Sequence, residues 1–514
     1  MLFNSYIFVF LFLPICLLGY YTLINRRLLE PALTWLVLCS LFFYGWWNPV
    51  YISLLVASML SNFLLGRLIS RQQEWRKPLL VFGIAGNLGV LGYFKYCDFF
   101  IGTFNSLSGS DFNLLHIVLP LGISFITFQK IAFLVDAYKG KTHEYNLLHF
   151  CLFVTFFPQL LAGPIVHHRE LIPQFVRLEN LQKVSSNLGI GLSIFLVGLF
   201  KKTVLADGAA AHANPVFDAA ANGATLTLLE AWGGSLAYSL QLYFDFSGYS
   251  DMAIGLARMF GVVLPLNFFS PYRARNISEF WRRWHITLSR FLRDYLYIPL
   301  GGNRSGEARR LLNLMITMLL GGLWHGAAWT FVVWGGLHGA YLVIHRSWER
   351  LTAPLQRFAA WRIGFTPLAY LLTFLSVMVA WVFFRATSFD AAWAVLQGMA
   401  GFNGISLHPD SAGLAEKLRS LGLSVDVSLY ATRLVGKDTL NWVVTLLLIA
   451  TCLPNTAQVF SRIGPALDEY SRPERYQGRL RWNPTRRWAM TIASLGLMGV
   501  LYMSQVSEFI YFQF

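Results

Sequence analysis

The sequence predicts an all-α polytopic membrane protein, and three observations lead to this fold class. Of its 514 residues, 55% are hydrophobic and only 13% are charged, whereas a soluble protein carries about 25% charged residues. The mean hydropathy is +0.50. Long apolar runs recur along the chain, and roughly 20 apolar residues cross a bilayer as a helix. We expect one membrane domain over residues 1–514, built as a multi-helix bundle.

Fourteen apolar segments are candidate membrane helices, and we expect some to be re-entrant, so that about 11–14 segments enter the membrane. The start of the chain lacks the basic region of a cleaved signal peptide, so its first run should remain as a helix. The segments lie at residues 5–23, 32–47, 51–68, 78–94, 117–137, 147–162, 186–205, 226–246, 249–265, 311–325, 328–345, 366–384, 440–453 and 487–504.

The distribution of charge favours an outside N-terminus, because basic residues follow the first, third and fifth segments. After residue 162 the alternation of basic and non-basic loops becomes irregular, which indicates a re-entrant or surface helix. Lys201-Lys202 is assigned to the cytoplasmic end of a membrane segment. The net charge of +15 is attributed to cytoplasmic loops and an anionic substrate. No nucleic-acid partner is expected, since no soluble basic domain accompanies this charge. The polar stretch 401–439 is predicted to be a soluble insertion.

Several function classes lack their sequence signals. The five cysteines are scattered without a CxxC pair, which indicates neither a disulfide framework nor a zinc site. His167-His168 has no third ligand at metal spacing, so we predict no metal site. No G-x-x-x-x-G-K-[ST] loop and no G-x-S-x-G motif occur. The sequence therefore indicates neither an ATPase nor a serine hydrolase.

The stretch from Asn276 to Gly339 holds the residues best suited to chemistry. Asn276 followed by Glu279 is a helix-start signal. The helix that follows is expected to place Trp281, Trp284, His285 and Leu288 on one face. This basic segment, 273–310, is too charged to cross lipid alone, so we expect it to be cytoplasmic or re-entrant.

His325 is the first catalytic candidate, because it ends an apolar helix beside Trp324 and two glycines. Histidine suits general base catalysis near neutral pH, and the glycines could open a channel beside the imidazole. A hydrogen-bonded packing histidine is the alternative. His285 is the second candidate, either orienting an acceptor or sharing the proton transfer, with a buried core histidine as the alternative. His338 is interpreted as a packing or interface residue.

Nine arginines against three carboxylates give the segment 273–310 a charge of +6. Guanidinium groups pair bidentately with phosphate, so this segment is a candidate site for a phosphorylated donor. The alternative is a cytoplasmic face attracted to anionic membrane lipids. We assign donor binding to Arg282, Arg283, Arg304, Trp281 and Trp324.

Two further features interrupt apolar runs. The stretch from Tyr243 to Asp251 carries two carboxylates and a glycine, which favours a tight turn within the membrane. Asp245 or Asp251 could instead orient a histidine. Lys130 is a candidate buried charge, with snorkelling to the membrane surface as the alternative.

Together these motifs resemble the membrane-bound O-acyltransferase family, and most closely its bacterial branch, which includes alginate O-acetyltransferase membrane subunits. The resemblance spans nearly the whole chain, and the paired Trp-His motifs are specific to it. The matching stretches are 92–96, 119–125, 157–164, 243–255, 280–285, 294–297, 300–304, 322–326, 381–385 and 509–514.

The resemblance implies a bundle of eleven or more helices around a central funnel, with the histidine at His325 essential and the one at His285 supporting. It also implies a multi-pass protein of the bacterial inner membrane that needs no cofactor. Acetyl would pass from cytosolic acetyl-CoA through the membrane for O-acetylation of an alginate- or cellulose-type exopolysaccharide. A periplasmic SGNH-hydrolase-like partner would complete the transfer.

Two other functions are compatible with polar residues in membrane helices. A transporter or flippase of a polysaccharide or lipid intermediate tends to show paired interrupted helices in two related halves, and no such pairing is evident. A passive scaffold for a polysaccharide assembly would not require His325.

Overall fold

The computed structural model of the chain describes residues 1–141, 146–161, 163–177, 181–304, 306–355, 359–407, 412–427, 436–467, 478–504 and 510. Helices dominate these residues, and one two-stranded sheet accompanies them. The all-α prediction is therefore confirmed. The chain forms two compact units, which are described separately: Met1–Phe200 with Gly248–Asn267 and Thr456–Gln513, and Lys201–Ser247 with Phe268–Asn455.

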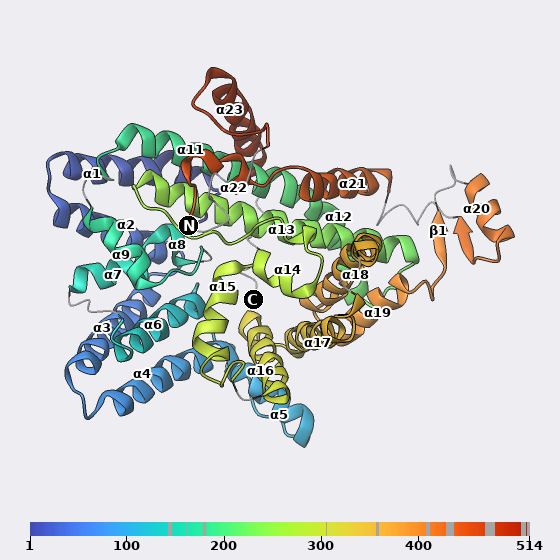
Figure 1. The fold of residues 1–514 in the computed structure, drawn as a ribbon, viewed down its shortest axis with the longest axis horizontal. Coiled ribbons are helices and arrows are strands. Elements are labelled where there is room, and N and C mark those ends of the chain that lie inside the picture. Colours follow the sequence, from blue (N-terminus) through green and yellow to red (C-terminus); the bar gives the residue numbers. More distant parts are fainter. Residues whose placement is uncertain are drawn as a thin grey trace. The chain divides into compact units, whose positions relative to one another are not determined.

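The first unit contains most of the helices predicted in the N-terminal part of the chain (Figure 1). Between α4 (Arg76–Leu91) and α6 (Ile123–Tyr138) the structure adds a helix, α5 (Cys97–Ser108), which none of the predicted apolar segments covers. The helices are η1 (Phe8–Phe12), α1 (Leu13–Asn25), α2 (Leu29–Gly45), α3 (Val50–Arg71), α4 (Arg76–Leu91), η2 (Gly92–Tyr96), α5 (Cys97–Ser108), α6 (Ile123–Tyr138), α7 (Leu147–Thr155), α8 (Phe157–Leu160), α9 (His168–Val176), α11 (Val184–Phe200), α22 (Thr456–Val459), η9 (Ser461–Ile463), α23 (Arg486–Leu501) and η12 (Tyr502–Ser504).

Glycines allow close helix packing in this unit. A methyl group on Gly255 would lie 2.5 Å from the backbone nitrogen of Phe195 and 2.6 Å from the carbonyl oxygen of Gly191. Small residues at such crossings drive helix association in membranes, where backbones must approach closely. Lys130 on α6 is buried, as expected, and its ammonium group donates a hydrogen bond to Ser58.

The second unit holds the remaining elements, and its sheet is a parallel pair with Ile405 opposite Val425. The elements are η3 (Lys201–Ala206), α12 (Asp207–Ala221), η4 (Pro271–Arg273), α14 (Ile277–Arg283), α15 (Ile286–Leu292), η5 (Arg293–Tyr297), α16 (Glu307–His325), α17 (Trp329–Leu351), α18 (Ala359–Arg385), α19 (Phe389–Met399), β1 (Ile405–Leu407), α20 (Ala412–Ser420), β2 (Val425–Val427) and α21 (Lys437–Cys452).

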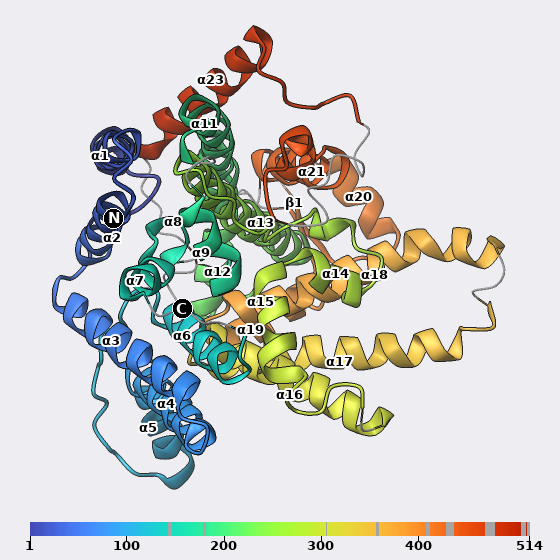
Figure 2. The same ribbon diagram turned by 60° about the vertical axis from the view of Figure 1, so that its left-hand side comes forward.

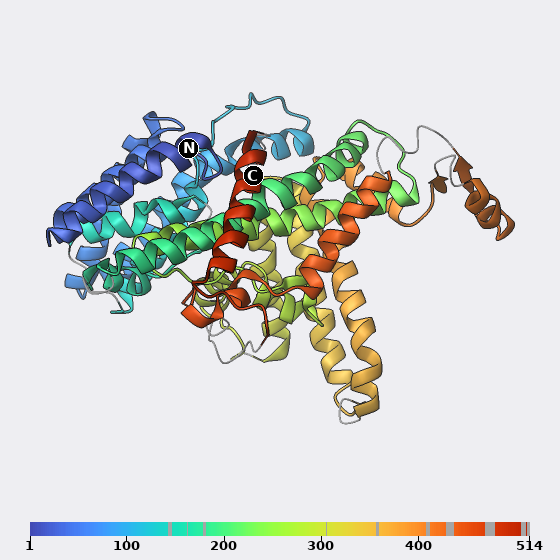
Figure 3. The same ribbon diagram turned by 90° about the horizontal axis from the view of Figure 1, so that it is seen from above.

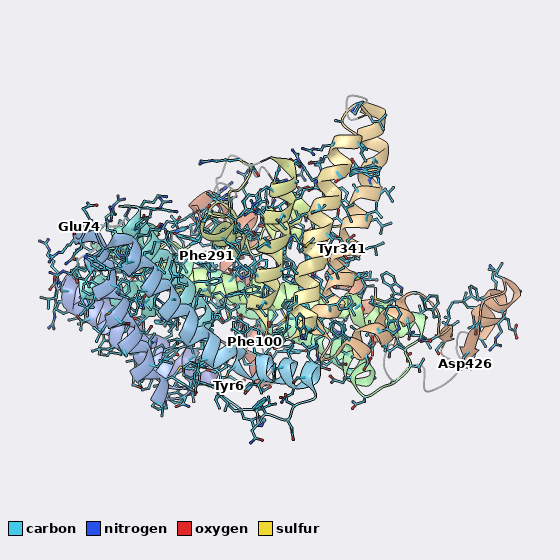
Figure 4. All side chains as sticks on the ribbon, turned by 90° about the horizontal axis from the view of Figure 1, so that it is seen from below. Tyr6, Glu74, Phe100, Phe291, Tyr341 and Asp426 are labelled. Carbon is cyan, nitrogen blue, oxygen red and sulfur yellow. The ribbon has the colours of Figure 1, made fainter. Side chains whose placement is uncertain are left out.

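Three long helices form the framework of the second unit. α16 packs along α17, and α17 packs along α18 (Figure 2). The α17–α18 hairpin extends beyond the other helices of the unit (Figure 3). Figure 4 labels two residues of this unit, Tyr341 on α17 and Asp426 in the 401–439 insertion. The insertion lies well apart from the α17–α18 hairpin. The described elements of the predicted 401–439 insertion are thus β1, α20, β2 and the first residues of α21.

The structure differs from the predictions in where some membrane helices begin and end. The runs 226–246 and 249–265 are joined in one helix, α13 (Leu228–Met259), so the turn expected at Tyr243–Asp251 is wrong. A continuous helical span also runs over Val184–Ala221, so the helix does not end at Lys201-Lys202, and the cytoplasmic assignment of this pair stays a prediction. Among the described residues, five helices are long and apolar enough to cross a membrane: Phe8–Asn25, Val50–Arg71, Arg76–Ser108, Val184–Ala221 and Gly364–Arg385.

Candidate active site

The basic segment forms two short helices rather than one. Asn276 caps α14 by accepting a hydrogen bond from the Glu279 backbone N–H at 2.8 Å, as predicted. Trp284 is extended, and His285 adopts a left-handed backbone with φ of 42° before α15 begins. The expectation that Trp281, Trp284, His285 and Leu288 share one helical face is therefore wrong. A left-handed conformation is unfavourable for residues other than glycine and is concentrated at functional sites.

His285 is fully buried against aromatic rings of the second unit. Its ring centroid lies 4.7 Å from that of Phe246, with an edge-to-face geometry. Phe268 and Trp324 complete this wall, each with its ring centroid 6.3 Å away. The break between α14 and α15 is what turns this imidazole into the interior of the unit.

His325 is the last residue of α16, and only 5% of its surface is exposed. Its ring centroid lies 4.9 Å from Trp324, 4.9 Å from Trp334 and 5.2 Å from Phe384. α16 ends here because Gly326 is extended and Ala328 caps the next helix. The imidazole is thus held at a helix end inside an aromatic enclosure.

The glycines on either side of His325 allow α16 to pack closely against α17. A methyl group on Gly322 would overlap the Phe331 carbonyl oxygen and lie 3.0 Å from the Gly335 Cα. Gly326 is covered in the same way by the Phe331 ring. The space beside Gly322 is therefore filled by the backbone of α17, and the expected channel at this glycine is not formed.

The structure brings both predicted histidines and both predicted tryptophans into one cluster. Trp324 contacts the rings of His285 and His325. Trp281 lies 5.9 Å, between ring centroids, from Trp334, which in turn contacts His325. Residues from α14, α16 and α17 therefore meet at Trp334.

The predicted arginines occupy different environments. Arg283 forms two hydrogen bonds to the Glu279 carboxylate, at 2.7 and 3.0 Å, and a third to the Phe269 carbonyl. Partial burial raises the pKa of Glu279, but the Arg275 backbone N–H and the Arg283 guanidinium together hold this pKa below its ordinary value. Arg283 thus stabilises α14. Arg282 and Arg304 are exposed.

A second basic cluster was missed at the sequence level. The Glu307 carboxylate lies 2.7 Å from Arg350, 3.6 Å from Arg346 and 3.7 Å from Arg310. Arg346 and Arg350 belong to the end of α17, and no spacing pattern predicts that they return to the start of α16. Burial lowers the pKa of His345 on α17, and the charges of Arg282 on α14 and Arg346 on α17 lower it further, which places Arg282 near this cluster.

The structure also joins Lys202, Asp207 and Asp245. The Lys202 ammonium lies 2.7 Å from the Asp207 carboxylate and 2.8 Å from that of Asp245. All three side chains are buried, Lys202 with 1% exposure. The other candidate carboxylate, Asp251, accepts a hydrogen bond from Thr456 at 2.6 Å within the first unit. Lys202 could have been recognised from the sequence, because it is a charged residue inside an apolar run.

This arrangement suits proton transfer in a shielded environment. A neutral imidazole can accept a proton through one ring nitrogen. Aromatic walls keep bulk water away, which strengthens electrostatic interactions and limits hydrolysis of a reactive acyl group. His325 has such walls, with a tryptophan on each side.

Comparison with known proteins agrees with this chemistry. The model of MBOAT, the membrane-bound O-acyltransferase family, matches residues 93–389, more than half of the chain. That range contains α14 to α18 and every candidate site residue.

Relatives match over large parts of the chain. A peptidoglycan O-acetyltransferase of Helicobacter pylori is 42% identical, covering 100% of this chain and 98% of the relative. A probable alginate O-acetylase of Azotobacter vinelandii is 43% identical over 78% of each chain. A teichoic acid D-alanyltransferase of Streptococcus thermophilus is 28% identical over 51% of this chain and 68% of the relative. The chain therefore belongs to the membrane-bound O-acyltransferase family and is a membrane O-acyltransferase.

Proposed function

We propose that this protein moves an acetyl group from cytosolic acetyl-CoA across a bacterial inner membrane, for O-acetylation of an extracellular polysaccharide. The observation that carries the proposal is His325, held at the end of α16 between Trp324 and Trp334. A transporter would have no need of a base in such an enclosure, and family membership favours the transferase.

His325 acts as the general base in this proposal. Its imidazole removes the proton from an acceptor hydroxyl as the oxygen attacks the thioester carbonyl. The C–S bond then breaks, an O-acyl ester forms, and the CoA thiolate leaves and takes up the proton. His285, on the other side of the Trp324 contact, orients the acceptor. Positioned proton transfer of this kind contributes about 10²- to 10⁴-fold to a rate.

The donor is anionic, so its phosphates require cations at the cytoplasmic face. Arg282 and Arg304 are exposed guanidinium groups suited to this contact. Arg283 contributes by holding α14, because its guanidinium is already bonded to Glu279. Trp281 and Trp324 line the route from these arginines towards His325.

The acceptor is a hydroxyl group on the periplasmic side. The relatives are named for peptidoglycan, alginate and teichoic acid, all of them polymers outside the cytoplasmic membrane. We propose that a periplasmic SGNH-hydrolase-like partner receives the acetyl group and passes it to the sugar hydroxyls.

Purified protein in lipid vesicles with acetyl-labelled acetyl-CoA tests the proposal. We expect CoA release and transfer of label to an added hydroxyl acceptor, such as a sugar oligomer or the partner. His325→Ala should abolish both while the protein remains folded. Normal CoA release by folded His325→Ala would refute the role of His325, and a wild-type protein that releases no CoA from any acyl donor would refute the proposed function.

A further inference from the structure

His338 lies at the centre of the aromatic cluster of the second unit and is fully buried. Its ring centroid lies 4.7 Å from that of Trp334 and 5.1 Å from that of Trp281. Phe280 stacks on it at 6.0 Å, and Tyr341, one turn further along α17, approaches edge-on at 5.8 Å. No part of this imidazole faces the surface of the unit.

The polar atoms of this cluster have no protein partner. Among the described residues, neither ring nitrogen of His338 has a hydrogen-bond partner, and the same holds for the indole nitrogens of Trp281 and Trp334. A buried polar group without a partner costs about 1–3 kcal/mol, and proteins pair more than 90% of such groups. Four unpaired nitrogens on three rings in mutual contact therefore require an explanation beyond packing.

The cluster is continuous with the catalytic histidine. The Trp334 ring lies 4.9 Å from His325 and 4.7 Å from His338, so one indole contacts both imidazoles. The helices that carry the two histidines meet at Gly322 and Gly335. The unpaired nitrogens therefore lie on and beside the same indole ring that contacts His325.

The number of donors and acceptors defines what can bind. A neutral imidazole offers one N–H donor and one acceptor nitrogen, and each indole offers one donor. Three donors and one acceptor complement a neutral group that accepts more hydrogen bonds than it donates. A hydroxyl group and a secondary amide both fit this description, whereas a carboxylate or phosphate would face the acceptor nitrogen of a buried neutral ring.

We propose that His338, with Trp281 and Trp334, forms a neutral hydrogen-bonding subsite that positions an amide or hydroxyl group of the substrates beside His325. This inference rests on the proposed acyl transfer. The group could come from two sources, an amide of the pantetheine arm of acyl-CoA or the hydroxyl of the acceptor. In either case His338 is a positioning residue, because its role is exerted through the group that it holds.

The test compares His338→Phe with His338→Gln in the full-length protein in lipid vesicles. Phenylalanine fills the space and removes the unpaired polar atoms, so His338→Phe should unfold at the same temperature as wild type or higher. Its acetyl transfer should fall by about 10- to 100-fold, the equivalent of one or two buried hydrogen bonds. His338→Gln retains a donor and an acceptor and should recover part of the activity.

Two further variants sharpen the result. Trp281→Phe keeps an aromatic ring but loses one donor and should show a smaller loss in transfer. His212→Phe is the control, because His212 is already bonded to Thr439 at 3.0 Å, and this variant should keep full activity.

Binding of labelled acetyl-CoA distinguishes the two sources of the bound group. Weaker binding by His338→Phe identifies the donor amide, and unchanged binding with impaired transfer identifies the acceptor hydroxyl. Full transfer by a folded His338→Phe variant would overturn the subsite while leaving the function of the wild-type protein intact. A wild-type protein without transferase activity would overturn both.

Discussion

Gly322 and Gly335 bring α16 and α17 so close that a methyl group on Gly322 would lie 3.0 Å from the Gly335 Cα. We expect Gly322→Ala to force the helices apart and displace both His325 and Trp334, with loss of most transferase activity and a lower unfolding temperature. Gly336→Ala is the matched control, because its added methyl group would meet only Leu319 at an ordinary 3.5 Å. Equal activity of the two variants would contradict the assigned role of this crossing.

His285→Ala should reduce acetyl transfer less than His325→Ala does, since His285 is assigned a supporting role. The left-handed backbone at His285 complicates the alanine variant, and asparagine tolerates that conformation better. His285→Asn should therefore be more stable than His285→Ala and still lose activity. If His285→Asn kept full activity, the imidazole would serve packing alone.

Lys202→Met should strongly destabilise the protein, because it leaves the Asp207 and Asp245 carboxylates without their buried cation. Removing one partner from a buried ion pair costs about 3–5 kcal/mol. Thermal unfolding in detergent measures the loss, and adding Asp207→Asn and Asp245→Asn should recover much of it. The neighbouring Lys201→Met is the control, because Lys201 is less buried. Similar unfolding temperatures for the two single variants would contradict the prediction.

Arg282→Ala and Arg283→Ala should have different effects. Arg282→Ala is expected to raise the KM for acetyl-CoA several-fold, and more so at low salt, where surface charges are less screened. Arg283→Ala removes the bonds to Glu279 and Phe269, so it should lower thermal stability. Kinetics at several ionic strengths, with Arg71→Ala on α3 as a control for net charge, would separate the two effects. A salt-independent KM for Arg282→Ala would exclude it from phosphate binding.

The arginines that we propose to bind the donor, and their neighbour Arg309, should face the cytoplasm. Cysteine placed at Arg304 or Arg309, in a background without the five native cysteines, should resist membrane-impermeant thiol reagents in intact cells. Both positions should become labelled after permeabilisation, since both side chains are exposed. Labelling from outside would place these arginines where cytosolic acetyl-CoA is absent.

Sequence patterns predicted the long helices well, because continuous apolar runs and an Asn276 cap are local signals. They failed where contacts between residues distant in the sequence determine the backbone conformation. Tyr243–Asp251 contains turn-forming residues, yet this stretch is helical, and Lys202, which is distant in the sequence, neutralises Asp245 within the unit. The left-handed residue at His285 could not be predicted, since a positive φ is uncommon for histidine and no glycine or proline marks the end of α14.

The candidate site shows the same difference between local sequence patterns and three-dimensional contacts. His285 and His325 were recognisable as titratable residues in apolar surroundings, and the structure joins them through Trp324. His338 was interpreted as a packing residue, because a sequence does not reveal whether a buried imidazole has a partner. The matching segment 509–514 lies outside the described residues except for Ile510, so its prediction stays untested.

Two contacts hold α16 and α17 together, at two positions along α16. Glu307 holds the far end of α17 through Arg350 at 2.7 Å, and Gly322 meets Gly335 one turn before His325. Fifteen residues of helix separate these points on α16, a length of about 22 Å at 1.5 Å per residue. Because of these two contacts, α16 resists sliding and rotation against α17, which keeps the imidazoles of His325 and His338 at a constant spacing and orientation. We therefore expect the substrates to move to these histidines, and the flexibility that catalysis requires to come from other elements.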